Sequence, residues 1–208
     1  PNEPGPYYAL ARLSHLGGRA HDARTLLDRA IAIDPTHAPS LAMLAGVLHY
    51  TDADASHIRS IHERVADIVV SGVTPLPPRS RADAPRLRVA YMSGDFREHS
   101  VSWFVRSLFE HHDRARFDVW CYSTSLRPLD GVTRSLRAAI ESRGGAWRAC
   151  EGMPDESLAR LIREDAIDIL IELSGLTEGN RLRTLAMRPA PLQITAIGYP
   201  GTDRKSVV

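Results

Sequence analysis

The strongest constraint on the fold is a series of short apolar segments in the second half of the chain. They are rich in β-branched and aromatic residues and occupy residues 87–92, 117–122, 146–150, 167–173 and 192–198. Helix-like stretches separate them at residues 101–111, 130–143, 155–165 and 180–187. Strands that alternate with helices form a parallel sheet that is covered on both faces. The pattern therefore predicts a doubly wound α/β domain of five strands, and Asp155 is expected to cap the third helix.

A helical pattern fills residues 1–70. Apolar and small residues recur there at the spacing of a helix-turn-helix repeat, namely Tyr7, Leu10, Ala11, Ala23, Leu27, Ala30 and Pro35. Gly17 and Gly18 interrupt the pattern and Pro35 ends the second helix. Residues 18–48 resemble the tetratricopeptide (TPR) repeat, and a second repeat loses its pattern from Thr51. We expect TPR-like hairpins and transitional helices, with a plain helical hairpin as the alternative.

Residues 71–86 are rich in proline, glycine, serine and arginine, which is typical of a linker. We therefore place the domain boundary there, between helical repeats at 1–70 and an α/β domain at 87–202.

Charge and composition restrict the classes of partner. The formal net charge is +1, from 26 basic and 25 acidic residues, which gives no reason to expect a nucleic acid or an anionic membrane as a partner. No apolar run approaches the roughly 20 residues of a membrane span, and the first residues form no secretion signal. Cys121 and Cys150 lack the spacing of a metal or disulfide framework and are expected to be buried thiols. These observations together predict a cytoplasmic location.

Topology selects three loops as candidates for the site. In doubly wound sheets, ligands bind outside the carboxyl ends of the strands, near the point where the strand order reverses. The loops that follow the first, fourth and fifth predicted strands span residues 93–103, 174–181 and 198–202.

The first of these loops contains Asp95 and His99, one helical turn apart. A carboxylate near an imidazole can orient the ring, fix its tautomer or raise its pKa, so the pair suits general-base work or hydrogen bonds to a sugar. Alternatively, Asp95 caps the helix that begins near His99 and the imidazole packs on the surface, and spacing alone favours this structural role. In the third loop, Gly198 and Gly201 allow either close approach to a ligand or an ordinary turn.

Several common nucleotide and metal motifs are missing from the sequence. The first strand is not followed by GxGxxG, and neither a Walker loop nor HExxH occurs. Readings as a nicotinamide, ATP or catalytic-zinc enzyme therefore have little support.

Four segments together resemble the bacterial O-GlcNAc transferase-type glycosyltransferases. They are LRVAYMSGDFREHSVSWF (87–104), FDVWCYSTS (117–125), IDILIELSGLTEGNR (167–181) and MRPAPLQITAIGYPGT (187–202). Their order and spacing, after a TPR tail, match the first half of that family's catalytic region. The resemblance implies a GT-B fold, of which residues 87–202 would be the Rossmann-like N-terminal half. It also implies inverting transfer of N-acetylglucosamine from UDP-GlcNAc to serine or threonine of proteins, without a metal ion, and TPR helices that guide protein substrates.

The resemblance assigns site residues by motif. Asp95 and His99 match active-site positions, at which the aspartate has been proposed to relay the acceptor's proton. The histidine has been proposed as a base and as a contact to the donor sugar or phosphate. Gly198 and Pro200 match the loop that closes around the sugar. The candidate substrate-binding residues are Ser100, Val101, Arg181, Gly198, Tyr199, Pro200 and Gly201.

Three positions depart from the pattern of the animal enzymes. Ser100-Val101 replaces Pro-Thr, which leaves the donor sugar open, and Glu178 stands where those relatives have a basic residue. Relatives of this architecture transfer fucose or glucose, so another nucleotide-sugar donor is one alternative function. A TPR adaptor with a non-catalytic Rossmann-like domain is the other.

The resemblance also implies that the chain is incomplete as an enzyme. Most nucleotide contacts of the family belong to a second Rossmann-like half, so the 208-residue chain alone is expected to be inactive. Residues 203–208, DRKSVV, no longer follow the family and match a translation of sequencing-adapter DNA, which predicts a non-native tail. The alternative is a genuine divergent C-terminus.

Overall fold

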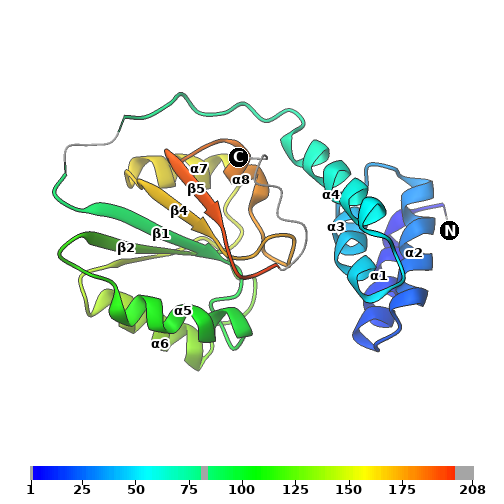
Figure 1. The fold of residues 1–208 in the computed structure, drawn as a ribbon, viewed down its shortest axis with the longest axis horizontal. Coiled ribbons are helices and arrows are strands. Elements are labelled where there is room, and N and C mark those ends of the chain that lie inside the picture. Colours follow the sequence, from blue (N-terminus) through cyan, green and yellow to red (C-terminus); the bar gives the residue numbers. More distant parts are fainter. Residues whose placement is uncertain (1, 81–83, 200–208) are drawn as a thin grey trace. The chain divides into compact units, whose positions relative to one another are not determined.

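The computed structural model describes residues 2–80 and 84–199. They fall into two compact units, one that ends at Gly72 and one that runs from Val73 to Tyr199 (Figure 1). Each unit has its own buried core.

The first unit consists of helices. They are α1 (Pro4–Leu16), α2 (Ala20–Ile33), α3 (Ala38–Val47), the short 3₁₀ helix η1 (Leu48–Tyr50) and α4 (Ala55–Val70). Consecutive α-helices pack against each other, and Ala11 and Ala23 are fully buried between α1 and α2, where small side chains let the two helices approach closely. Helix α4 forms beyond the point where the repeat pattern stops, because Asp54 caps it and Ile61 and Val65 are buried. The predicted helical hairpins are confirmed, and their assignment to the TPR class stays a prediction.

The second unit is a five-stranded parallel sheet with helices on both faces, as predicted. Its strands are β1 (Leu87–Ser93), β2 (Phe117–Ser123), β3 (Ala146–Ala149), β4 (Ile169–Glu172) and β5 (Leu192–Thr195), in the order β3-β2-β1-β4-β5. The helices are α5 (Ser100–His111), α6 (Gly131–Glu141), α7 (Asp155–Glu164) and α8 (Leu182–Ala186).

Alternation along the strands builds two separate core layers. Val89 and Tyr91 of β1 pack with α5 and α6 on one face, and Ala90 and Met92 pack with α7 and α8 on the other (Figure 1). Both predicted thiols, Cys121 and Cys150, are free and buried in these layers. Within the described ranges, no helix is both long and apolar enough to cross a membrane.

One predicted detail is wrong. Pro154, and not Asp155, occupies the N-cap position of α7, and no side chain caps that end. Asp155 is the first residue of the helix, and its carboxylate instead accepts a hydrogen bond from Thr184 of α8 at 2.8 Å. A tertiary contact therefore uses the side chain that the local pattern had assigned to capping.

The predicted linker contains neither helix nor strand at residues 71–80 and 84–86. Its later part is nevertheless attached to segments of the second unit that flank β4 and α8. The backbone N–H of Leu76 donates to the carbonyl of Met187, and Arg79 donates to the carbonyl of Ile167 and pairs with Asp168 at 3.3 Å.

Candidate active site

The strand order reverses between β1 and β4, which are neighbours in the sheet although β2 and β3 lie between them in sequence. The chain leaves β1 toward β2 on one side and returns to β4 on the other. This topological switch point is where open α/β sheets bind their ligands. The loops after β1 and β4 meet there.

A close backbone contact joins these two loops. A Cβ atom on Gly94 would lie 2.8 Å from the carbonyl oxygen of Glu178 and 3.1 Å from the Cα of Gly179, so only glycine fits without a shift of the backbone. The hydroxyl of Ser174 accepts a hydrogen bond from the Gly94 N–H at 3.2 Å. The Thr124 hydroxyl, after β2, donates to the Gly179 carbonyl at 2.8 Å. These contacts join the first and second predicted loops into one rigid surface at the carboxyl ends of β1 and β4, which we call the carboxyl edge of the sheet.

Asp95 is buried in this edge, with only 4% of its surface exposed. Its carboxylate pairs with the Arg97 guanidinium at 3.1 Å and accepts from the Thr177 hydroxyl at 3.4 Å. The Ser102 hydroxyl donates to its backbone carbonyl at 2.8 Å. The structural alternative in which Asp95 caps the following helix is wrong, because α5 has a different N-cap.

That N-cap is His99. Its Nδ1 accepts a hydrogen bond from the backbone N–H of Val101 at 3.3 Å and lies 3.9 Å from the Asp95 carboxylate. A ring nitrogen that accepts from an N–H carries no proton, so in the neutral ring the proton lies on Nε2. In this geometry His99 offers a hydrogen-bond donor at Nε2 and no free lone pair for accepting a proton.

A second buried carboxylate, Glu172, was missed by the sequence reasoning. It ends β4, is 1% exposed and accepts hydrogen bonds from the backbone N–H groups of Ser174 and Gly175. Burial raises the pKa of Glu172 to about 7, the nearby charge of Asp95 adds to the increase, and the two backbone hydrogen bonds oppose it. The sequence feature that could have indicated it is a single acidic residue at the end of an otherwise apolar strand, two residues before Ser174-Gly175.

Two predicted substrate-binding residues begin helix α5. Ser100 is exposed in the first turn, beside His99. The side chain of Val101 is 2% exposed and belongs to the core beneath α5, so its contribution to the edge is the N–H that it donates to His99.

Arg181 is occupied by contacts within the fold. Its guanidinium pairs with Asp155 at 3.1 Å and donates to the carbonyl of Met153, which ties the start of α8 to the start of α7. These contacts of Arg181 do not involve Asp95 or His99.

The third predicted loop is described only as far as Tyr199, so Pro200 and Gly201 lie outside the described residues. A Cβ atom on Gly198 would lie 1.4 Å from the carbonyl oxygen of Leu173. Similarly, a Cβ on Gly175 would lie 2.3 Å from the Cβ of Tyr199. These glycines allow close approach of the chain to itself, at the end of β4.

The sequence is similar to a known protein family and to several of its members. A family model described as Glycosyl transferase family 41 matches residues 32–208. The "Probable UDP-N-acetylglucosamine--peptide N-acetylglucosaminyltransferase SPINDLY" of Arabidopsis thaliana is 42% identical over 116 residues, which are 56% of this chain. The UDP-N-acetylglucosamine--peptide N-acetylglucosaminyltransferase of Caenorhabditis elegans is 34% identical over 155 residues, or 72% of this chain. In both cases the matched part is 13% of the relative's length.

A solved structure shares the fold. A mutant of the Thermobaculum terrenum O-GlcNAc transferase superposes with a TM-score of 0.83 at 33% sequence identity. The match covers 96% of this chain and 38% of that protein.

The buried Glu172 predicts a specific pH dependence of stability. Its pKa in the folded state lies above the ordinary value, so the folded chain holds more protons than the unfolded chain between about pH 4.5 and 7. The contribution of Glu172 to the free energy of unfolding therefore falls as the pH rises through that window. Between pH 5 and pH 7.5 this decrease in the free energy of unfolding should amount to roughly 1–4 kcal/mol. In Glu172→Gln the decrease should be absent, which urea unfolding at the two pH values measures.

The exposed Glu156 on α7 provides a matched control. Glu156→Gln should unfold with the pH profile of the unaltered chain. Identical profiles for Glu172→Gln and the unaltered chain would contradict the assignment of a raised pKa to Glu172.

Proposed function

Because the chain belongs to glycosyl transferase family 41, we propose that it forms part of an enzyme that glycosylates proteins. The reaction is transfer of N-acetylglucosamine from UDP-GlcNAc to serine or threonine hydroxyls, and the names of the relatives support the donor and the peptide acceptor. The observation that carries the proposal is the pair Asp95 and His99, held 3.9 Å apart at the switch point of the sheet.

The geometry supports different roles for the two side chains. His99 donates from Nε2 to an oxygen of the donor sugar or of the diphosphate, where negative charge develops as UDP leaves. Its capping bond to Val101 keeps Nδ1 occupied, so His99 is not the base of this proposal. Asp95, neutralised by Arg97 and fixed by Thr177, positions the loop that presents His99.

The rate of an inverting transfer depends on holding the acceptor hydroxyl in line with the leaving group. Positioning of this kind suits an edge in which Gly94 and Gly179 are in close contact. We assign no metal ion to the reaction, and we assign the helices of residues 1–70 to the guidance of protein substrates. The two buried thiols suit a reducing, cytoplasmic location.

The chain spans about 13% of the length of the curated relatives it matches and 38% of the T. terrenum transferase. In the GT-B arrangement, donors to the diphosphate come from the second half as well as from this one. We therefore propose that the 208-residue chain alone does not catalyse transfer.

A second candidate function concerns the donor sugar. Ser100 is exposed beside His99, at a position where the sequence departs from the animal enzymes. Another nucleotide sugar is the alternative that this position favours.

The isolated chain should bind UDP weakly or not at all, because it supplies only one wall of the proposed cleft. Isothermal titration of the 208-residue chain with UDP should give no saturable heat in the micromolar range. A micromolar dissociation constant would show that this half holds the nucleotide without its partner half.

In the complete protein, His99→Ala should reduce turnover with UDP-GlcNAc at least tenfold, because it removes the Nε2 donor from the developing charge. It also removes the helix cap, at a cost of about 1 kcal/mol of stability. His99→Asn separates the two effects, since an asparagine caps α5 while its shorter side chain ends short of the Nε2 position. It should keep the melting temperature of the wild type and still lose turnover, and near wild-type turnover in His99→Asn and His99→Ala would exclude His99 from the site.

A further inference from the structure

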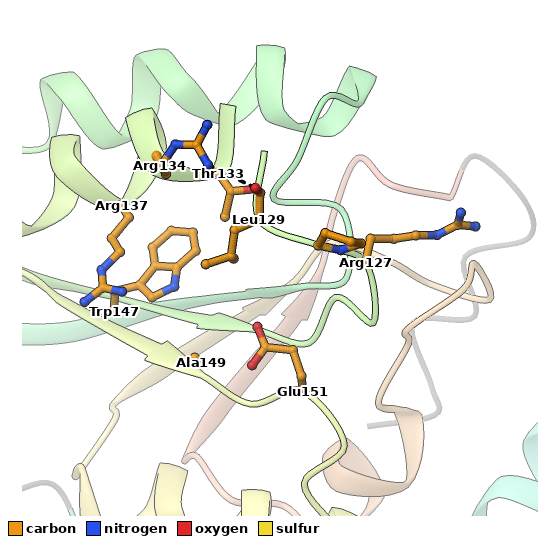
Figure 2. Close-up of a pocket in the computed structure, with 9 residues that line it drawn as sticks. Arg127, Leu129, Thr133, Arg134, Arg137, Trp147, Ala149 and Glu151 are labelled. Atoms are coloured by element: carbon orange, nitrogen blue, oxygen red, sulfur yellow. Dashed lines mark hydrogen bonds between the residues drawn. The ribbon is translucent and has the colours of Figure 1, made fainter. Parts of the chain in front are cut away.

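A cavity of about 300 Å³ lies beside β3 on the face of the sheet that α6 covers, away from Asp95 and His99 (Figure 2). Its walls come from residues 127–129, from the first half of α6 and from alternate positions of β3 and the following turn. Neither Asp95 nor His99 lines it. The proposed transfer reaction therefore leaves this cavity without a role.

The apolar part of the cavity is built on Trp147. Its indole packs against Phe96 of the core, with ring centroids 5.4 Å apart, so the ring is held in place from one side. On the cavity side, Trp147 and the 55% exposed Leu129 lie next to each other (Figure 2). A fixed aromatic ring with an electron-rich face is a surface on which polarised C–H groups of a ligand can stack.

The charged groups of the cavity do not combine into an anion site. Arg127 pairs with Glu178 at 2.8 Å and Arg137 pairs with Glu141 at 2.9 Å, so carboxylates already neutralise both cations. The third arginine of the lining, Arg134, shares the cavity with the carboxylate of Glu151, so an acidic peptide or a phosphate would meet little net positive charge.

Two polar groups remain available to a ligand. Arg134 donates one hydrogen bond, to the Leu129 carbonyl at 3.0 Å, and forms no ion pair within residues 2–80 and 84–199. Glu151 is exposed, and no hydrogen bond or ion pair joins it to another described residue. In the view of Figure 2, Arg134 lies above the Trp147 ring and Glu151 below it. An arginine supplies only donors and an ionised glutamate only acceptors.

We propose that this cavity binds a neutral pyranose sugar. The ring's axial C–H face stacks on Trp147, its hydroxyl oxygens accept from Arg134, and its hydroxyl protons are donated to Glu151. A cavity of this size is at the lower end of the range for small-molecule sites, roughly 300–1,000 Å³, and suits a single sugar ring. The proposal does not depend on the transfer reaction, because it concerns a free or protein-attached sugar that is bound and not transferred.

The three tryptophans of the chain allow a direct test. In ¹H–¹⁵N spectra of the full 208-residue chain, each indole N–H gives a resonance that a Trp→Phe variant assigns. Titration with methyl N-acetyl-β-D-glucosaminide should shift the Trp147 signal saturably, with a dissociation constant on the order of 1 mM for so small a ligand. Trp103, which is 67% exposed on α5, is the internal control and should not shift.

Surface variants establish the site without disturbing the core. Glu151→Ala and Arg134→Ala should each weaken the binding at least fivefold, whereas Glu156→Ala, which removes an exposed glutamate elsewhere, should leave it unchanged. His99→Asn should also leave it unchanged, which separates this cavity from the proposed active site.

Three results would overturn the sugar site. They are the absence of a saturable Trp147 shift, an equal shift of Trp103, and binding that survives both Glu151→Ala and Arg134→Ala. None of them bears on the transferase proposal, which is tested by turnover of the complete protein.

Discussion

The contact between Gly94 and Gly179 is the constraint on which the candidate site depends. It brings the backbones after β1 and β4 closer together than any side chain would permit. The hydrogen bond from the Gly94 N–H to Ser174 and the one from Thr177 to Asp95 both follow from this approach. Without it, the two loops would be neighbours in topology only, and the carboxylate of Asp95 would lose its hydrogen bond from Thr177.

The charged and titratable side chains at this edge, Asp95, Glu172 and His99, have different electrostatic surroundings. There are two buried carboxylates: Asp95 lies in the loop after β1, Glu172 ends the neighbouring strand β4, and each has its own compensation. The Asp95 carboxylate pairs with the guanidinium of Arg97, whereas hydrogen bonds from Ser174 and Gly175 only partly offset the burial that raises the pKa of Glu172. His99 uses one ring nitrogen to begin α5 and leaves the other as a donor. The same fold that builds the helix thus determines which hydrogen bond the imidazole can offer.

Periodicity was sufficient to predict the sheet, its covering helices and the loops after β1 and β4. These features follow from local patterns and from the rule that parallel strands align their carboxyl ends. The details that could not be predicted depend on tertiary contacts. Asp155 makes a bond to Thr184 where a cap was expected, Arg181 pairs with Asp155, and Glu172 becomes notable only once its burial is known. The spacing of Asp95 and His99 is compatible both with Asp95 as a helix cap and with the two residues as part of an active site. Only the folded structure shows that His99 caps α5.

The central claim is that Asp95 and its loop belong to a site that transfers N-acetylglucosamine to proteins. The most direct measurement is intact-mass spectrometry of an acceptor protein after incubation with the complete enzyme and UDP-GlcNAc. We predict that one or more N-acetylhexosamine units are added to serine or threonine, and that Asp95→Asn, which removes the charge that pairs with Arg97, lowers the rate of addition while the protein stays folded. Transfer from a different nucleotide sugar only, or undiminished transfer by Asp95→Asn, would contradict the account.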